Sequence, residues 1–270
     1  FSVISGKYNY GIGIMRYIHK LLIGMFFIAT FGFGQTNYSL SFDGDDDYVE
    51  ITNQSSATTV FGNTLSVAVW IKVNSGDNTH RNIITNRTSS DGYVLTVDNQ
   101  NKFRPHLELP AGFAQFGGNT NVEQNTWYNA VFTYDGSSMK LYVNGELDGE
   151  YANLSGEIID PVENSSLFIG TRQDLVQFFP GFIDEVSIWN TALSQTEIQS
   201  YMSTSLSGSE TGLVGYWNFN EGTGTTASDA TSNDNDGTIY GATWSTDVPF
   251  TGTTTTSALT WSVQAKASLG

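Results

Sequence analysis

Two acidic parts of the sequence, far apart along the chain, carry the residue types that bind a hard metal ion. Asp43 and Asp45–Asp47 crowd into one short polar turn, and Asp184 stands within Gly181–Trp189. A buried carboxylate is costly, so Asp184 is expected to be protonated, hydrogen-bonded by backbone N–H groups, paired with a cation, or placed at the start of its strand. Carboxylate oxygens from a turn and from an inward-facing Asp suit Ca²⁺. The alternative is a solvated turn without metal and an Asp184 that caps the backbone.

The strand expected at Gly181–Trp189 sets the faces on which its side chains lie. With strict alternation, one face carries Phe182, Asp184, Val186 and Ile188, and the other carries Ile183, Glu185, Ser187 and Trp189. The sequence therefore predicts that Asp184 points to the same side as Val186 and Ile188.

A row of carboxylates at Glu146, Asp148 and Glu150 is the one enzyme-like pattern. Alternate residues of a strand share a face, and retaining glycoside hydrolysis needs two carboxyl groups about 5–5.5 Å apart. The row begins directly after the turn expected at Asn144-Gly145, however, and Gly149 weakens a strand. We favour a charged strand that protects an exposed sheet edge and keep a glycoside hydrolase as the alternative.

One predicted strand, Phe103–Leu109, presents polar side chains that could bind a ligand. Arg104, His106 and Glu108 project together by alternation. They line either a binding face or the solvated outer face of a sandwich. No histidine accompanies a Gly-x-Ser-x-Gly motif, which argues against serine hydrolysis.

Loop aromatics are the other binding candidates. Phe113, Phe116, Phe178 and Phe179 are expected at the rim of the fold, where a ring can stack on a sugar or contact a protein partner. The alternative is that they fold back over the core as lids, because large exposed apolar groups are uncommon without a partner.

The elements that must position these residues are strands. With 28 Gly, 17 Phe, 13 Tyr and a charged fraction of 14%, the composition favours strands and turns over helices. Leu65–Val73 alternates as an inner strand of a sandwich, and Trp127–Tyr151 reads as a three-stranded meander with a tight turn at Asn144-Gly145. Ser194–Glu197 forms a capping box that starts one short helix.

The first strand, from Tyr38, is interrupted by the acidic turn. Leu40 and Phe42 precede the turn, and Val49 and Ile51 resume the period of two after it. This pattern predicts a hairpin-like entry into the fold.

Composition excludes several classes of function. The absence of cysteine removes disulfides, zinc–thiolate sites and thiol nucleophiles. A net charge of −16 argues against binding to nucleic acid or to anionic lipid. The same charge suits a surface protein that holds divalent cations.

The N-terminal part reads as a secretory signal peptide. A basic segment, Met15–Lys20, precedes the apolar run Leu21–Phe31, and small residues stand before an expected cut ahead of Gln35. The run is short for a membrane span, so no membrane insertion is expected after cleavage, with an uncleaved anchor as the alternative. Residues 1–34 are thus upstream residues and signal peptide, 36–250 one domain, and 251–270 a Thr-rich linker with the start of a following module.

Four motifs in order carry a family resemblance. Ser41–Val49, Ala68–Lys72, Trp127–Gly145 and Gly181–Trp189 resemble the laminin-G-like, concanavalin A-like jelly-roll domains of bacterial surface proteins, and Gly212–Pro249 resembles a segment found beside such domains. The resemblance implies an all-β fold, an antiparallel β-sandwich with one short helix. It is specific for the fold and weak for the ligand, because this fold hosts binding modules, adhesins and enzymes.

The resemblance also suggests site residues. Such families commonly hold a calcium ion at the rim, which carried over points to Asp43 and Asp184 as ligands, with Asp46 as a third. Concanavalin A-like glucanases use a carboxylate row similar to Glu146, Asp148 and Glu150.

The expected function is a non-catalytic extracellular recognition module with a structural Ca²⁺. It would bind a polysaccharide or a glycoprotein glycan, or mediate adhesion, within a longer secreted or cell-surface protein whose other domains are its partners. The alternatives are the glycoside hydrolase and a structural spacer.

Overall fold

The computed structural model describes residues 36–52, 62–75, 79–88, 91–161 and 165–250. The expected signal peptide and the Thr-rich linker lie outside the described residues. No helix in these ranges has the length and apolar character needed to cross a membrane.

Among the described residues, the strands form two antiparallel sheets, and the first of them, sheet A, has eight strands. They are β1 (Ser39–Asp43), β3 (Leu65–Val73), β8 (Trp127–Tyr134), β9 (Ser138–Val143), β10 (Glu146–Ala152), β12 (Pro180–Trp189), β13 (Leu213–Trp217) and β16 (Thr243–Ser245). Their order is β10-β9-β8-β3-β12-β1-β16, and β13 pairs with β12 beside this path.

The second sheet, sheet B, also has eight strands. They are β2 (Tyr48–Ile51), β4 (Arg81–Arg87), β5 (Gly92–Val97), β6 (Phe103–Leu109), β7 (Gly112–Gln115), β11 (Leu167–Ile169), β14 (Thr226–Ala227) and β15 (Gly237–Tyr240). Their order is β14-β15-β2-β11-β4-β5-β6-β7. The predicted all-β antiparallel sandwich is confirmed.

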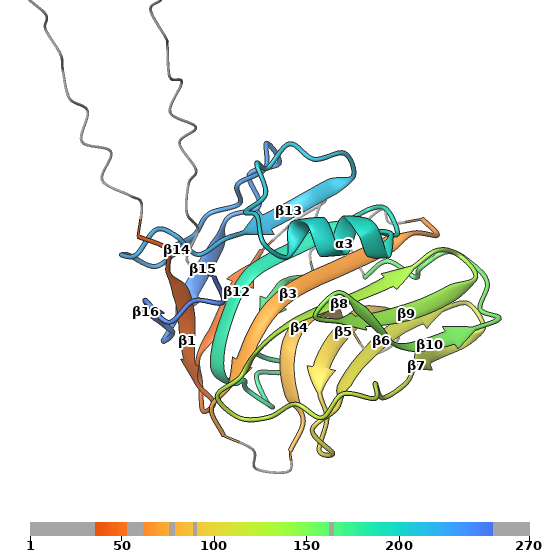
Figure 1. Cartoon of the computed structure of the whole chain (residues 1–270), viewed down its shortest axis with the longest axis horizontal. Coiled ribbons are helices and arrows are strands. Elements are labelled where there is room, and N and C mark those ends of the chain that lie inside the picture. Colours follow the sequence, from red (N-terminus) through yellow and green to blue (C-terminus); the bar gives the residue numbers. More distant parts are fainter. Residues whose placement is uncertain (1–35, 53–61, 76–78, 89–90, 162–164, 251–270) are drawn as a thin grey trace, which may run out of the picture. The chain divides into compact units, whose positions relative to one another are not determined.

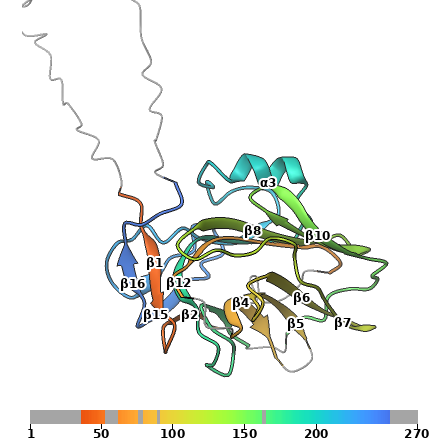
Figure 2. The same cartoon turned by 60° about the horizontal axis from the view of Figure 1, so that its bottom comes forward.

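The two sheets pack face to face around one hydrophobic core (Figure 2). Val67, Val69 and Ile71 of β3 are fully buried in it, as are Leu95 of β5 and Leu107 of β6. Each such side chain contributes about 1.5–3 kcal/mol by leaving water. The inner strand predicted at Leu65–Val73 is therefore confirmed, and it lies near the middle of sheet A.

A helix covers the outer face of sheet A. Figure 2 shows α3 (Gln195–Tyr201) on the side of sheet A that faces away from β4, β5 and β6. The predicted capping box is present, because the Ser194 side chain accepts the N–H of Glu197 and the Glu197 side chain accepts the N–H of Ser194. Ile198 of the helix joins a second, smaller apolar cluster with Trp189 and Tyr216. The described residues thus form three layers over this part of the sheet, α3, sheet A and sheet B (Figure 2).

The predicted meander is confirmed, whereas the hairpin-like entry is wrong. β8, β9 and β10 pair in succession, and Asn144 and Gly145 both have positive φ, 50° and 78°, as a type I′ turn requires. By contrast, β1 pairs with β12 and β16 in sheet A, while β2 pairs with β11 and β15 in sheet B. The acidic turn therefore crosses from one sheet to the other at the rim.

A β-bulge in β12 changes the faces that strict alternation predicted. The register to β3 shifts between Asp184, which pairs with Trp70, and Ser187, which pairs with Ala68. Glu185 lies at this bulge with a φ of 52°. One extra residue inverts the alternation, so Ile183, Val186 and Ile188 all enter the core. Asp184 therefore lies on the outer face with its partner Trp70, and the predicted grouping of Asp184 with Val186 and Ile188 is wrong.

Candidate functional site

The acidic turn gathers three carboxylates at the rim. Asp43, Asp46 and Asp47 each offer one oxygen, and these oxygens lie within 4.8 Å of one another. Asp43 Oδ1 accepts the N–H groups of Asp45 at 2.8 Å and of Asp46 at 3.3 Å. Asp47 Oδ2 accepts the N–H of Asp43 at 2.8 Å. The backbone of the turn thus holds the carboxylates close together despite their like charges.

The electrostatics of this turn suit a divalent cation. Burial raises the pKa of Asp47, and the charges of Asp43, Asp46 and Asp45 raise it further, while a backbone hydrogen bond opposes them. Calcium binds hard carboxylate oxygens at about 2.3–2.6 Å, so two oxygens on one ion lie up to about 5 Å apart. The spacing and the donor type of the three carboxylates both fit the ion.

The structure does not bring Asp184 to the acidic turn. Asp43 pairs with Pro180 across β1 and β12, and Asp184 lies four residues further along β12, about 13 Å away at 3.3 Å per residue. One calcium ion cannot bind both residues, which corrects the expected joint site. Asp184 is buried, and its Oδ1 accepts the N–H of Glu185 at 2.9 Å. Burial and the neighbouring Glu185 raise its pKa well above the ordinary value.

A polar cleft of about 340 Å³ opens beside the acidic turn. We call it the rim cleft. It is lined by Asp43, Gly44, Asp45, Ser75, Thr79, Gln177, Phe178 and Pro180. Its lining comes from the acidic turn, the β3–β4 connection and the segment before β12, so three stretches distant in sequence meet there. The predicted rim position of Phe178 agrees with this geometry.

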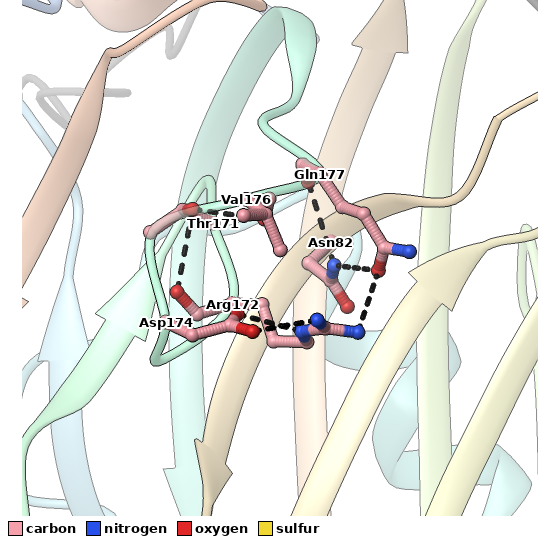
Figure 3. A network of polar contacts seen from close by, with 6 residues as sticks. All are labelled: Asn82, Thr171, Arg172, Asp174, Val176 and Gln177. Carbon is pink, nitrogen blue, oxygen red and sulfur yellow. Dashed lines mark hydrogen bonds and ion pairs between the residues drawn. The ribbon is translucent and has the colours of Figure 1, made fainter.

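The loop that carries Gln177 and Phe178 is held by its own hydrogen bonds (Figure 3). Arg172 binds both carboxylate oxygens of Asp174, at 2.7 and 2.6 Å. Asn82 of β4 donates to the Gln177 side chain at 3.1 Å, and its backbone N–H donates to the Gln177 carbonyl at 3.1 Å. The loop is thereby fixed to sheet B, which reduces the entropy lost when a ligand binds.

The predicted polar row on β6 is also real. Arg104, His106 and Glu108 alternate outward, and the His106 ring lies 5.3 Å from the ring of Phe113 on β7. Most of these charges already have protein partners, since Arg104 binds Asp98 at 3.0 Å and His106 binds Glu108 at 3.0 Å. Burial lowers the pKa of His106. This face therefore offers one exposed ring but few free polar groups.

Two of the predicted loop aromatics act as lids. Phe179 is fully buried in the core. Phe116 is partly buried and packs against the core, with its ring beside Gly149. Phe113 is 58% exposed. The alternative reading of these rings thus holds for two of the four, and Phe113 and Phe178 keep accessible positions.

The carboxylate row on β10 is not assembled. A register shift lies between Leu147 and Gly149, and Asp148 turns inward, where its Oδ1 accepts from the N–H and Oγ1 of Thr120 at 2.9 and 2.6 Å. Glu146 accepts instead from Gln195 and Gln199 of α3, at 3.1 and 3.2 Å. The bulge removes the shared face that the hydrolase alternative needs.

Sequence reasoning missed Ser75, Thr79 and Gln177 as cleft residues. They are common polar residues in connections, and no motif marks them. The signal that could have found Gln177 is its place in a polar loop directly before the strand with the Ile-Asp-Glu motif.

Comparison with known proteins agrees with the fold. Residues 43–199 match the family Laminin_G_3, described as the concanavalin A-like lectin/glucanases superfamily. Pappalysin-1 of Mus musculus is 38% identical over 80 residues, and that of Homo sapiens 36%. These 80 residues are 29% of this chain and only 5% of either pappalysin.

Solved structures include a match that shares the architecture. A "putative carbohydrate binding protein" from Bacteroides ovatus ATCC 8483 superposes with a TM-score of 0.65 and 21% identity, over 80% of this chain and 62% of that chain. The CBM40 of a Ruminococcus gnavus IT-sialidase, bound to alpha2,3 sialyllactose, is 17% identical with a TM-score of 0.47, over 62% of this chain and 98% of that chain. At 21% identity the likeness to the Bacteroides ovatus protein concerns the fold alone.

Proposed function

Because the chain belongs to the concanavalin A-like lectin/glucanases superfamily, we propose that it is a non-catalytic carbohydrate-recognition module that binds a glycan in the rim cleft. The ligand class in the name of the Bacteroides ovatus protein is the one proposed here. The proposal rests on the rim cleft, and the family match agrees with it.

The rim cleft combines the groups that sugar recognition uses. Its volume of about 340 Å³ lies within the ordinary range of ligand pockets. Asp45, Ser75 and Gln177 offer acceptors and donors for sugar hydroxyls, and the Phe178 ring offers an apolar surface for the C–H face of a pyranose. Because hydrogen bonds already fix the loop around Gln177, this surface is formed before a ligand binds.

We propose Asp43, Asp46 and Asp47 as the calcium-binding residues. When bound there, calcium would neutralise the turn and offer a hard cation at the edge of the rim cleft. The three side chains would then hold the turn in the conformation that shapes the cleft wall, because Asp43 belongs to both.

The glycan proposal is tested by a glycan array in calcium-containing buffer, followed by calorimetric titration with the best ligand. Phe178→Ala should weaken binding roughly tenfold, which corresponds to about 1.4 kcal/mol. Phe113→Ala is the matched control, since it removes an exposed ring on β7, three strands away from β4 in sheet B. Absence of any glycan ligand, or equal loss in both variants, would contradict the assignment to the rim cleft.

The calcium proposal is tested by thermal melts in calcium and in chelator. Calcium at about 100 times its dissociation constant should add roughly 2.7 kcal/mol to the unfolding free energy. Asp46→Asn should abolish most of this gain, whereas Glu123→Gln, an exposed carboxylate elsewhere, should retain it. Identical melting curves with and without chelator would remove the metal site while leaving the glycan proposal open to its own test.

The hydrolase alternative makes a separate prediction. Because Glu146 binds α3 and Asp148 binds Thr120, Glu146→Gln and Glu150→Gln should leave any trace polysaccharide hydrolysis unchanged. A loss of activity in both variants would restore the enzyme reading.

We further propose that the module acts outside the cell, in adhesion to glycan-bearing surfaces and beside other domains of a longer chain. The signal-peptide pattern and the acidic, cysteine-free composition support this. Adhesion predicts that cells or particles coated with the glycan ligand bind the immobilised protein, and that free ligand competes.

A further inference from the structure

A small cavity lies between the outer face of sheet A and α3, and it shares no lining residue with the rim cleft. Its volume is about 30 Å³, enough for one or two water-sized groups. Residues of β3, β8, β12 and β13 line it from below, and Ile198, Tyr201 and Met202 line it from the helix side. Figure 1 shows α3 lying across these strands.

The bulge in β12 directs a carboxylate into this cavity. Glu185 lines the cavity and has a φ of 52°, a left-handed backbone that residues other than glycine rarely adopt. Bulges often re-aim a side chain beside a functional site. The Glu185 carboxylate accepts hydrogen bonds from the Tyr216 hydroxyl and, at 3.4 Å, from Ser205 Oγ.

A second acceptor in the cavity wall has no donor beside it. Asn129 is 6% exposed, and its buried Oδ1 has no hydrogen-bond partner among the residues that the structure describes. Ser187 Oγ already accepts from Trp189 Nε1 at 3.0 Å. Among the described residues that line the cavity, none is Lys, Arg or His. An unmet acceptor and a carboxylate thus face one small space.

Aromatic rings complete the wall. Trp70, Trp189, Tyr201 and Tyr216 all line the cavity. Trp189 and Tyr201 stack with ring centroids 5.3 Å apart and an interplanar angle of 16°. Aromatic faces attract cations, so the rings and the acceptors favour the same sign of charge.

We propose that this cavity binds the head group of a primary ammonium ligand. A primary ammonium has three donors, which Glu185 and Asn129 Oδ1 can accept, and its size matches the space. An anion would be repelled by the Glu185 carboxylate, and a sugar ring is too large. The ligand is either a free alkylamine or a lysine side chain of a peptide, and the probes below separate these sources.

The test uses calorimetric titration and tryptophan fluorescence of the full chain with methylammonium chloride, against sodium chloride at equal ionic strength. Saturable binding of methylammonium is expected, with tetramethylammonium, which has no donor, at least tenfold weaker. Binding of Nα-acetyl-lysine amide in addition would identify peptide lysine as a source, and its failure beside methylammonium binding would identify a free amine. No saturable response to methylammonium, or equal binding of tetramethylammonium, would overturn the proposal.

Two variants locate the binding. Glu185→Gln and Asn129→Ala should each weaken methylammonium binding at least tenfold, while Glu123→Gln, which changes an exposed carboxylate outside the cavity, should leave it unchanged. Circular dichroism checks folding, and Asn129→Ala carries the test if Glu185→Gln does not fold. Unchanged binding in the folded variants would overturn the assignment to this cavity.

Discussion

The buried Glu185 should make the protein less stable as the pH rises through neutrality. Burial raises the pKa of Glu185 from 4.5 to about 7, while hydrogen bonds from Tyr216 and Ser205 oppose the rise. In the unfolded chain this carboxyl loses its proton near 4.5, so between 4.5 and 7 the folded state binds more protons. The stability that neutral Glu185 contributes is therefore present below about 4.5 and is lost as the pH passes through 7.

The size of the effect follows from the two pKa values. A displacement of this size corresponds to about 3 kcal/mol. Asp184, on the same strand, shifts in the same direction, and part of its shift comes from repulsion by Glu185. Carboxyls such as Asp98 act in the opposite direction. Burial raises the pKa of Asp98, but hydrogen bonds from the backbone and from Arg104 outweigh burial and lower it. The contribution of Glu185 to the pH dependence of stability is therefore obtained only from the difference in unfolding free energy between two variants.

The assay is urea unfolding followed by tryptophan fluorescence from pH 4.5 to 8, on the natural sequence and on Glu185→Gln. The amide of Gln keeps an acceptor for Tyr216 and removes the ionisation. Relative to Glu185→Gln, the natural chain should lose about 3 kcal/mol across this range. Glu123→Gln, at an exposed carboxylate, serves as the surface control. A difference that stays constant with pH would refute the reasoning.

Three further predictions concern the packing. Asp247→Ala should cost about 1 kcal/mol or more in urea unfolding, because Asp247 pairs with the buried Lys72; an unchanged midpoint would contradict this. Ile188→Ala, at a fully buried core position, should cost about 2–5 kcal/mol, and a loss below 1 kcal/mol would place the residue outside the core. Gly145→Ala, at φ 78° and with a new Cβ 2.8 Å from Met202 Sδ, should lower the melting temperature more than Gly224→Ala, where φ is 85° and nothing lies within 4 Å; equal effects would mean that the contact with α3 is unimportant.

Much of the fold was predictable because its signals are local. The turn at Asn144-Gly145 needs two residues with positive φ, which Asn and Gly tolerate best. The capping box needs only Ser194 and Glu197. Leu65–Val73 shows its inner face by alternation alone. Such signals lie within a few residues of one another, so no knowledge of distant neighbours is required.

The bulge at Glu185 was not predictable in the same way. Alternation assumes a constant register, and one extra residue reverses the faces of everything that follows. No Gly, Pro or Asn marks the position, since the residue with positive φ is a glutamate. The pairing of β12 with β3 and β13 fixes the bulge, and that pairing depends on contacts distant in sequence.

The candidate site also has one part that local sequence predicts and one part that depends on distant pairing. The acidic turn could be found from its composition, and its three carboxylates do lie together. The residues that lie beside the acidic turn could not be predicted from composition. The register of β1 on β12 places Pro180 beside Asp43 and leaves Asp184 further along the strand. A family motif shows which residues recur, but the register decides which of them meet.

The outer coverage of the sandwich supports our proposal that glycan recognition takes place at the rim. On sheet A, α3 covers one part of the outer face. The last described residues are held to another part of sheet A, because Asp247 accepts from Trp127 Nε1 at 3.0 Å and from Ser39 Oγ at 2.7 Å. On sheet B, the polar row of β6 is largely neutralised by its own ion pairs. The turns at the rim keep polar groups that no strand partner satisfies, and they can change without altering the core. If the rim cleft is the glycan site, residues that select the ligand lie in turns such as Asp43–Asp47 rather than in the core, so the ligand can differ across a family while the fold persists.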